Sequence, residues 1–417
     1  MSRPLVLSPD PLGAELAGPA IRAAELARAI GADAAYSQPH APGDLRARAS
    51  AAGVVVAHPP WPLAARALRR SGARLIYDLY DPEPLEALQF LAGRRAAVRR
   101  TVTALSLDRL VTALHDGHAF LCASERQRDL WTGALLAQRL IAPAVHDADP
   151  SLGGVLAIVP FGVPDDPPAP GPGPRERFGL APGDELVLWN GGVWDWLDAG
   201  SVLHAVARLS PERPRLRMIF MGASAAAQAR AAEARARTLA RDLGLLGRVV
   251  RFNEGWVPYA ERGAWLLQAD CAVAAHHDHL ETRFSHRTRL LDCVWAGLPV
   301  VCTRGDELAE RIERDDLGAA VPTEDPDALA GALARVLDRG RGEYAERMDA
   351  AARELRWSRV AQPLARLVAE REGSAPLGAR AGRPRPRSPA LRARSAAYSA
   401  ARTALNAAGR PDWPRVR

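Results

Sequence analysis

A block of polar and charged side chains, HHDHLETRFSHR at residues 276–287, has the clearest chemical potential in this sequence. The apolar run 271–275 before it predicts a buried strand, and residues 288–296 after it carry apolar side chains at the spacing of one helical face. Ligands of open parallel sheets lie at the carboxyl ends of strands, facing helix N-termini. The block therefore lies where we expect a ligand to bind.

The residue types of this block indicate an anionic ligand. Free N–H groups at a helix start attract anions, and an arginine can bind phosphate through two parallel hydrogen bonds. Arg289 adds further positive charge, and Ser285 and Thr288 are placed to cap the helix. We predict a diphosphate site that includes Arg283, Ser285, Arg287 and Thr288. A solvated charged loop is the alternative for such a block taken alone.

The histidines of the block invite comparison with a metal site. His276, His277 and His279 adjoin Asp278, but neighbours on one loop rarely converge on a single ion. The sequence offers no second cluster of ligands and no CxxC pair. We therefore expect no metal.

The rest of the chain alternates strand and helix patterns, which predicts an α/β fold with parallel sheets covered on both faces. The predicted strands are 4–8, 54–57, 74–77, 119–122, 155–159, 185–189, 216–220, 248–252, 271–275, 300–302 and 318–321. The predicted helices include 19–30, 94–114, 124–140, 198–209, 225–243, 258–268, 288–296, 325–337 and 353–370. Ser124, with Gln127 three residues later, is expected to cap the helix 124–140, and a break is expected near Pro363.

Other polar, glycine and aromatic residues follow these strands. Gly191 and Gly192 allow a backbone to approach a ligand closely, and Trp194 follows them in a loop that should be exposed. Trp256 could stack on a base or a sugar, or could simply cover a helix end.

In the first half of the chain, two carboxylates follow a predicted strand. Asp78 and Asp81 could position an acceptor hydroxyl or take its proton. Asp81 has an alternative role as the cap of a helix that starts at Pro82.

Charge and composition exclude several classes of protein. Ten arginines and one aspartate give residues 373–417 a formal charge of +9, so the first 372 residues account for −2 of the total of +7. All 55 basic residues are arginines, which makes the high charge weak evidence for nucleic acid. The apolar runs are too short to span a membrane, and no signal peptide is seen. We expect a cytoplasmic protein.

The Pro/Gly-rich segment PFGVPDDPPAPGPGP cannot form regular structure and marks a boundary. We expect an N-terminal domain at 1–160, a hinge at 161–174, a second domain at 175–345, helices at 346–372 that cross back to the first domain, and a partly disordered basic tail at 373–417. Residues 389–408 of the tail could form a helix, and the tail either contacts an anionic membrane peripherally or is simply solvated.

Several segments together resemble a known family of enzymes. LLDCVWAGLPVVCT (290–303), FNEGWVPYAER (252–262), LWNGG (188–192) and VPFGVPDD (159–166) are similar to motifs of GT-B nucleotide-sugar glycosyltransferases of the retaining family 4 type. The resemblance implies two Rossmann-like doubly wound domains whose parallel sheets face an interdomain cleft. It also implies that Asp292 binds the nucleotide ribose.

The sequence departs from the family at two places. Phe284 stands at the family's first acidic position, which suggests that Glu281 holds the sugar instead. The family's arginine and lysine after the first glycine-ended strand are replaced by VWDWLD, so Arg283 and Arg287 would supply the charge for the diphosphate.

The function implied is transfer of a sugar from a nucleoside-diphosphate sugar to a hydroxyl acceptor, such as a cell-envelope glycan or glycolipid. Asp78, Asp81 and Glu281 are the catalytic candidates. The donor site would contain Gly191, Gly192, Trp194, Trp256, His279, Arg283, Ser285, Arg287, Thr288 and Asp292. No cofactor, metal or nucleic-acid partner is expected. A nucleotide-sugar epimerase and a non-catalytic nucleotide-sugar-binding subunit are the alternatives.

Overall fold

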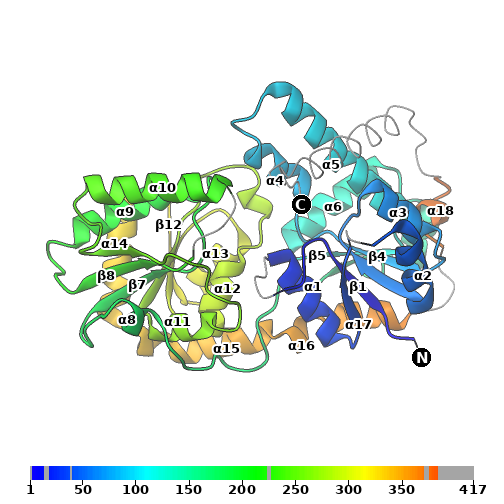
Figure 1. Ribbon diagram of the computed structural model, residues 1–417. Coiled ribbons are helices and arrows are strands. Elements are labelled where there is room, and N and C mark those ends of the chain that lie inside the picture. The colour runs from blue at the N-terminus through cyan, green and yellow to red at the C-terminus, as the bar shows by residue number, and fades with distance from the viewer. Residues whose placement is uncertain (1, 14–17, 38–39, 223–226, 371–374, 384–417) are drawn as a thin grey trace. The chain divides into compact units, whose positions relative to one another are not determined.

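The computed structural model describes residues 2–13, 18–37, 40–222, 227–370 and 375–383. The chain forms two compact units, one of residues 1–161 and 357–417 and one of residues 162–356 (Figure 1). The chain therefore passes from one unit to the other twice. Inside the second unit, Val163 pairs with Arg356 next to these two crossings.

The first unit is built on a six-stranded parallel sheet of order β2-β1-β3-β4-β5-β6. Its inner strands are apolar runs buried on both faces, as expected for a sheet covered by helices. The strands are β1 (Leu5–Ser8), β2 (Asp33–Tyr36), β3 (Val54–Ala57), β4 (Arg74–Asp78), β5 (Ala119–Cys122) and β6 (Leu156–Ile158).

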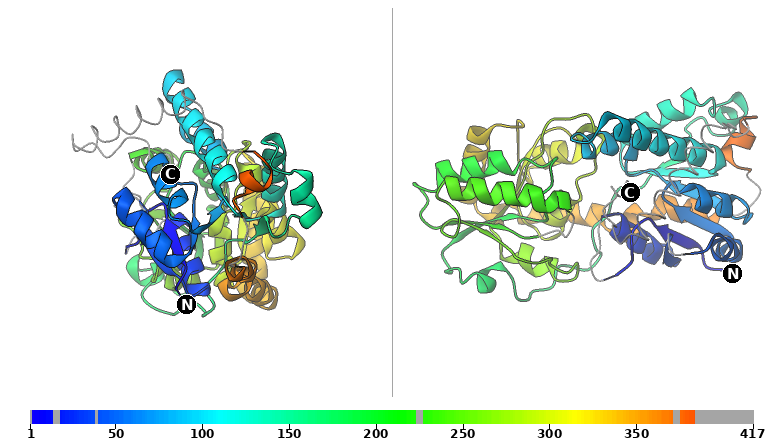
Figure 2. Two further views of the ribbon diagram at one scale, coloured as in Figure 1. Left: turned by 90° about the vertical axis from the view of Figure 1, so that its right-hand side faces the viewer. Right: turned by 45° about the horizontal axis from the view of Figure 1, so that its top comes forward.

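Helices cover both faces of this sheet (Figure 1). They are α1 (Gly18–Ala29), α2 (Pro42–Ala52), α3 (Pro62–Arg69), α4 (Glu83–Phe90), α5 (Ala96–Asp116), α6 (Glu125–Ala137), α7 (Pro143–Ala148), α16 (Trp357–Val360), α17 (Gln362–Ala369) and α18 (Leu377–Arg380). The predicted break near Pro363 is present between α16 and α17. Residues 375–383 of the predicted tail pack on α5 through the buried Leu377 (Figure 2). The predicted helix at 389–408 lies outside the described residues.

The second unit repeats the plan with a parallel sheet of order β12-β11-β10-β7-β8-β9. β7 lies at the centre, and successive strands extend the sheet in both directions from it, which places a topological switch point beside β7 and β10. The strands are β7 (Glu185–Trp189), β8 (Leu216–Phe220), β9 (Val250–Phe252), β10 (Cys271–Ala274), β11 (Val300–Thr303) and β12 (Gly318–Val321).

The helices of the second unit also cover both faces of its sheet. α9 packs against α10 and α14, and α12 packs against α11 and α15. The helices are α8 (Pro174–Arg177), α9 (Ala199–Leu209), α10 (Ala227–Asp242), α11 (Arg262–Gln268), η1 (Thr282–Phe284), α12 (Thr288–Trp295), α13 (Glu307–Arg314), α14 (Pro326–Arg339), η2 (Arg341–Tyr344) and α15 (Ala345–Leu355).

The Pro/Gly-rich segment is irregular as predicted, and it is anchored on the second unit. The indole of Trp295 donates to the carbonyl of Asp166 at 2.8 Å. Pro168 lies so close to Gly263 that a Cβ there would come within 2.9 Å of it. These contacts fix the middle of the segment on α11 and α12.

Two capping predictions have different outcomes. The Ser124 hydroxyl accepts from the backbone N–H of Gln127 at 3.2 Å, which confirms the predicted cap of α6. The predicted Asp81 cap is wrong, because α4 begins one residue later than expected, at Glu83, and Pro82 occupies the cap position. Proline has no side-chain acceptor for the first-turn N–H groups.

All four cysteines are buried, and none forms a disulfide bond. Within the ranges given above, no helix combines the length and the apolar character that a membrane crossing requires.

Candidate functional site

A turn of two glycines ends β7 at the switch point of the second sheet. Gly191 has a φ of 137°, which L-residues with a side chain rarely adopt. Gly222, at the end of β8, lies against this turn, and a Cβ on it would come within 3.0 Å of the Gly191 carbonyl carbon. The turn is thus formed by closely packed backbone that carries no side chain of its own.

Arg289, in the first turn of α12, lies against this glycine turn. Its Nη2 donates to the carbonyl of Gly192 at 2.6 Å, and the Asn190 side chain donates to the carbonyl of Arg289 at 2.8 Å. A Cβ on Gly191 would lie 3.0 Å from the guanidinium carbon. These reciprocal contacts join the end of β7 to the start of α12.

The charge of Arg289 is not neutralised by an ion pair. Burial lowers its pKa to about 10, so the side chain remains a cation at neutral pH. No carboxylate among the residues that the structure describes lies within ion-pair distance of it. A partly buried cation without a paired anion is costly, and an anionic ligand would relieve that cost.

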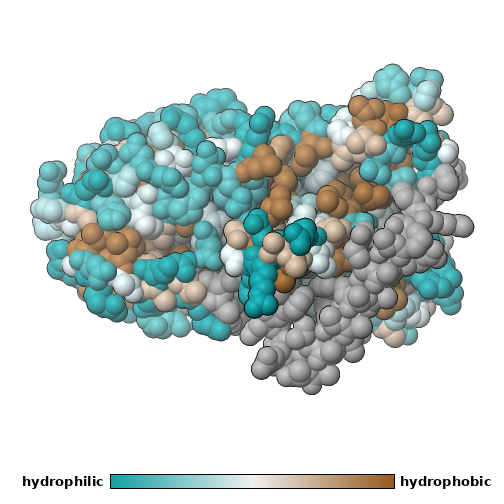
Figure 3. All heavy atoms as spheres, turned by 90° about the horizontal axis from the view of Figure 1, so that it is seen from above, coloured by the Kyte–Doolittle hydropathy of each residue, from teal (hydrophilic) through white to brown (hydrophobic). Residues whose placement is uncertain are grey.

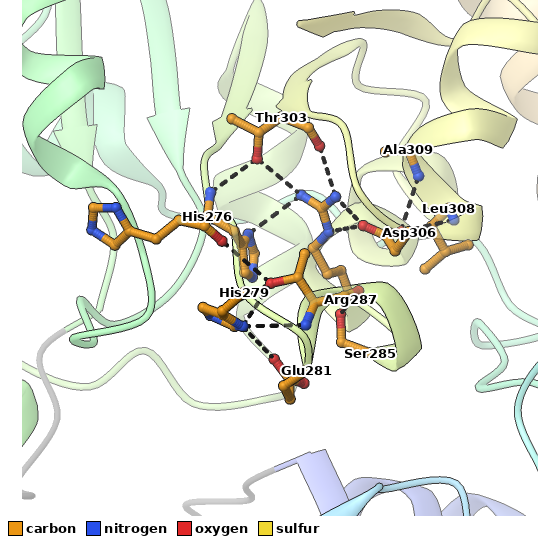
Figure 4. Close-up of polar contacts among 11 residues, drawn as sticks. His276, His279, Glu281, Ser285, Arg287, Thr303, Asp306, Leu308 and Ala309 are labelled. Carbon is orange, nitrogen blue, oxygen red and sulfur yellow. Dashed lines mark hydrogen bonds and ion pairs between the residues drawn. The ribbon is translucent and has the colours of Figure 1, made fainter. Parts of the chain in front are cut away.

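Arg287, two residues earlier, is instead fully engaged inside the unit. It is buried and forms an ion pair with Asp306, and its Nη2 donates to the carbonyl of Thr303 at 2.7 Å (Figure 4). Asp306 in turn caps α13 by accepting from Leu308 N at 2.8 Å. These contacts favour a role for Arg287 in positioning the 276–287 loop over the direct diphosphate contact that the sequence suggested.

His276 belongs to the same buried network. Its backbone N–H donates to the Thr303 hydroxyl at 2.9 Å, and its Nδ1 lies 3.3 Å from Arg287 Nη1. Burial, followed by the charge of Arg287, holds the pKa of His276 well below its usual value. The ring is therefore neutral and accepts a hydrogen bond.

The outer part of the loop brings together three of the predicted site residues (Figure 4). His279 Nδ1 accepts from the backbone N–H of Thr282 at 3.2 Å and lies 3.6 Å from a Glu281 carboxylate oxygen. Burial, and then His277, lowers the pKa of His279. Ser285 Oγ donates to the carbonyl of Thr282 at 3.0 Å. A neutral imidazole and a carboxylate thus lie side by side.

The predicted caps of α12 are wrong. The cap position is occupied by Arg287, whose side chain makes no capping hydrogen bond, while Ser285 bonds within η1 and Thr288 is the first helical residue. The chain turns into the helix one residue before Thr288, so neither hydroxyl is at the cap. The start of α12 is therefore left without a side-chain cap, next to Arg289.

Asp292, on the following turn of α12, is paired. Arg262 Nε donates to its Oδ1 at 3.0 Å, and the Arg262 guanidinium lies 3.6 Å from the ring centre of Tyr259. The same guanidinium lies 4.5 Å from the ring centre of Trp295. The pair fixes the orientation of Asp292, and ribose binding by this carboxylate stays a prediction.

The remaining predicted residues of the second unit lie on loops at the carboxyl ends of its strands. Trp194 stacks on Trp196 with ring centres 4.9 Å apart. Trp256 is 40% exposed after β9, and Arg283 is exposed on η1. The backbone N–H of His277 donates to the Trp196 carbonyl at 3.2 Å, which joins the β7 and β10 loops.

In the first unit, Asp78 forms a buried, two-pronged ion pair. Arg22 donates to its two oxygens at 2.6 and 3.0 Å and to the carbonyl of Val159 at 2.9 Å. Asp81 is partly exposed in the turn before α4. Asp78 also lines a hollow at the ends of β1, β3 and β4, together with His58 and Tyr80. Its contacts suit a positioning group, and its catalytic role stays a prediction.

Sequence reasoning named Arg289 only as added charge and missed Arg22, Asp306 and Arg262. Each of these last three is a single charged residue in a helix or at its cap, and only the fold shows which oppositely charged side chain it pairs with. No group of three or more histidine, cysteine or acidic side chains in the described ranges is placed to hold a metal ion.

Comparison with known proteins identifies the second unit. Residues 185–339, from β7 through α14, match the family described as Glycosyl transferases group 1. The second unit is a group 1 glycosyltransferase domain. A search of curated proteins finds no match.

Solved glycosyltransferase structures share the fold of most of the chain. The Anabaena protein HepE in complex with UDP-glucose superposes with a TM-score of 0.64 at 14% identity, covering 88% of this chain and 100% of that one. WaaG, a glycosyltransferase involved in lipopolysaccharide biosynthesis, gives 0.57 at 14% identity, covering 88% and 99%. Sucrose-phosphate synthase from Thermosynechococcus elongatus gives 0.58 at 16% identity, covering 88% and 98%.

These findings confirm two predictions from the sequence. The chain has the GT-B arrangement of two Rossmann-like α/β units, each with a parallel sheet. It is a glycosyltransferase, on the strength of the group 1 domain within that fold. The similarity to the solved structures, at these identities, concerns the fold alone.

Proposed function

We propose that this glycosyltransferase takes its sugar from a nucleoside-diphosphate sugar, binds the diphosphate at the glycine turn of the second unit, and transfers the sugar to a hydroxyl acceptor with retention of configuration. The observation that carries the proposal is the cation of Arg289, which lies on Gly191 and Gly192 without a paired carboxylate. This arrangement offers a positive charge and bare backbone at one place.

The start of α12 adds to this attraction. Its first-turn N–H groups have no side-chain cap, and such groups carry a partial positive charge that stabilises phosphate. When the bond from sugar to diphosphate breaks, negative charge grows on the leaving diphosphate. Arg289 and the helix start would stabilise that charge, so we propose transfer without a metal or cofactor.

The nucleoside would lie beside the diphosphate. Trp256 presents an exposed ring after β9, which suits stacking on a base, and Asp292 carries a carboxylate that can accept from ribose hydroxyls. Glu281, beside the neutral His279, is our proposed contact to the sugar hydroxyls. Arg283 on η1 can add charge from the outside of the loop.

The related structures support particular donors and acceptors. HepE has been solved with UDP and with UDP-glucose, which supports a uridine sugar as the first donor to test. WaaG is involved in lipopolysaccharide biosynthesis, which supports a cell-envelope glycan or glycolipid as the acceptor to test. We propose cytoplasmic action, with peripheral placement at the inner face of the membrane.

The acceptor would bind to the first unit. Two hollows there share His58 at the carboxyl end of β3, and one of them is lined by Asp78. Because Arg22 fixes both oxygens of Asp78, this carboxylate can orient a hydroxyl without moving. Asp81 lies at the next turn and is more exposed.

The proposal is tested by thermal-shift measurements with UDP-, GDP-, ADP- and TDP-sugars on the wild type, Arg289→Gln and a control, Arg241→Gln. A ligand at about 100 times its Kd should stabilise the protein by ~2.7 kcal/mol. We expect one donor to stabilise the wild type and the control but not Arg289→Gln. Stabilisation of none of the three proteins by any donor would contradict the proposal.

Turnover then separates transfer from the alternatives. With the selected donor, labelled sugar should appear on an acceptor from a panel of glycans and lipid-linked saccharides. Conversion of the donor to an epimer without any acceptor would indicate an epimerase. Binding without turnover across the whole panel would indicate a non-catalytic binding subunit.

A further inference from the structure

The hairpin of α4 and α5 has features of a surface-binding element. Three residues form its own small core, Ala87, Leu91 and Val102, against which Phe90 and Val98 pack. The later part of α5 belongs instead to the main core of the first unit. The hairpin end, residues 85–107, therefore extends from the unit on a small apolar support (Figure 2).

Positive charge is concentrated on this hairpin end. Residues 85–107 carry a net charge of +3, from one acidic residue, Glu86, and four arginines, namely Arg94, Arg95, Arg99 and Arg100. Three are exposed and Arg99 is partly exposed, and no carboxylate in the described part of the chain pairs with any of them. Some arginines exposed elsewhere, such as Arg304 and Arg353, form ion pairs with acidic residues.

Apolar side chains are exposed next to these arginines. Leu107 is 45% exposed and lies seven residues after Arg100, two helical turns away on the same face of α5. Leu88 of α4 is 38% exposed, and Leu63 of the neighbouring α3 is 59% exposed. Figure 3 looks onto this end of the unit and shows apolar surface beside strongly hydrophilic surface.

We propose that the α4–α5 hairpin binds the surface of an anionic lipid bilayer. Unpaired arginines near an anionic bilayer contribute ~1 kcal/mol each, and exposed leucines can enter the headgroup boundary. The one aromatic residue of the hairpin end, Phe90, packs in its small core, so the hairpin lacks the exposed rings that stack on single-stranded nucleic acid. This inference is independent of the donor site and of the basic tail.

The test uses the full chain and two vesicle preparations, phosphatidylcholine alone and phosphatidylcholine mixed with phosphatidylglycerol. The hairpin variant is Arg95→Gln/Arg100→Gln. The control is Arg241→Gln/Arg248→Gln, which removes the same charge from exposed positions of the second unit. We expect the wild type and the control to sediment with anionic vesicles and the hairpin variant to bind about tenfold more weakly or worse.

A second variant, Leu88→Ser/Leu107→Ser, tests the apolar part. At high salt, which screens the arginines, the wild type should keep a residual binding to the vesicles that this variant lacks. Circular dichroism checks that the variant folds. The proposal is overturned if the wild type does not prefer anionic vesicles, or if both hairpin variants bind as the control does. It is also overturned if single-stranded RNA, at the same concentration of phosphate groups as the vesicles, displaces the protein from them.

Discussion

Arg287 and Arg289 stand two positions apart at the start of α12 and have entirely different surroundings. Arg287 is the non-helical cap residue, with ψ 86°, whereas Arg289 lies in the first turn of the helix, so the two side chains leave the backbone in different directions. Arg287 consequently meets Asp306 and the end of β11, while Arg289 meets the glycine turn after β7. At the residue scale, the site depends on which of these two cations is left without a carboxylate.

Removing the Arg289 cation should weaken donor binding without unfolding the protein. A hydrogen bond to a charged group contributes about 1.5–3 kcal/mol, so Arg289→Gln should raise the Kd for a nucleoside diphosphate about 10- to 100-fold. Titration calorimetry measures this. An unchanged Kd in a folded variant would exclude Arg289 from the diphosphate site.

The close approach at the glycine turn gives a second prediction. A methyl group on Gly222 would lie 3.0 Å from Gly191 and would push the turn away from β8. We expect Gly222→Ala to weaken donor binding about tenfold or more and to lower stability by about 1–3 kcal/mol through overpacking. Gly244→Ala is a poor control because of its positive φ, whereas Gly255→Ala places its methyl group in open space.

His118 in the first unit predicts a pH dependence of stability. Its Nδ1 accepts from the Leu75 N–H at 3.0 Å, and burial, then Arg74, lowers its pKa from 6.5 to about 4. Since the unfolded chain takes up this proton first, the stabilisation is complete above pH 6.5 and is lost as pH falls towards 4.

Allowing for partial exposure, His118 should account for about 1 kcal/mol of stability lost between pH 7.5 and pH 5. Urea unfolding of the wild type and His118→Gln at the two pH values measures it. The variant should lose less stability than the wild type on acidification. Equal losses would show that other groups cause the pH dependence.

At the element scale, the buried network of Arg287 joins three elements. It connects the 276–287 loop, the end of β11 and the cap of α13. Breaking a buried ion pair by removing one partner costs about 3–5 kcal/mol because the other charge is left unpaired. Arg287→Met and Asp306→Asn should each cost this much.

A double-mutant cycle tests whether the two residues act as a pair. The double variant should cost clearly less than the two single variants together, as measured by urea unfolding. Additive losses would mean that the residues stabilise the unit independently. Hydrogen exchange of residues 276–287 measures how far each variant disorders the loop. If the Kd for the nucleotide rises in step with this exchange, Arg287 acts by positioning the loop.

Most inner strands could be predicted from the sequence for a physical reason. Val54–Ala57, Glu185–Trp189 and Leu216–Phe220 are continuous or nearly continuous apolar runs, because a parallel strand covered by helices is buried on both faces. The edge strand Asp33–Tyr36 and helix Pro42–Ala52 were missed. The first is half exposed and the second has little apolar periodicity.

The roles of site residues were less predictable than the elements that carry them. The sequence places the polar block, the glycine turn and α12 correctly along the chain. It cannot show that Ser285 bonds within η1, that Asp78 is held by Arg22, or that Asp292 pairs with Arg262. The partners of Asp78 and Asp292 are distant in sequence and are brought near only by the fold, and the Ser285 bond depends on a local 3-10 turn that the sequence pattern does not reveal.

At the scale of the whole molecule, two α/β units of similar plan have different charge arrangements. The second unit presents a cation on a glycine turn at its switch point. The first presents an Arg-rich hairpin and two hollows that share His58, one of them lined by Asp78. The group 1 domain match concerns the second unit only. Donor chemistry, acceptor binding and surface attachment would then be divided between separate parts of the chain.

The most direct test of this account compares a nucleoside diphosphate with its free nucleoside, using the base selected by the donor screen. Both are titrated into the wild type, Arg289→Gln and the control Arg241→Gln. The account predicts that the diphosphate tightens binding in the wild type and the control, and that Arg289→Gln loses most of this difference while keeping its affinity for the nucleoside. An undiminished difference in Arg289→Gln would contradict the assignment of the diphosphate to the glycine turn.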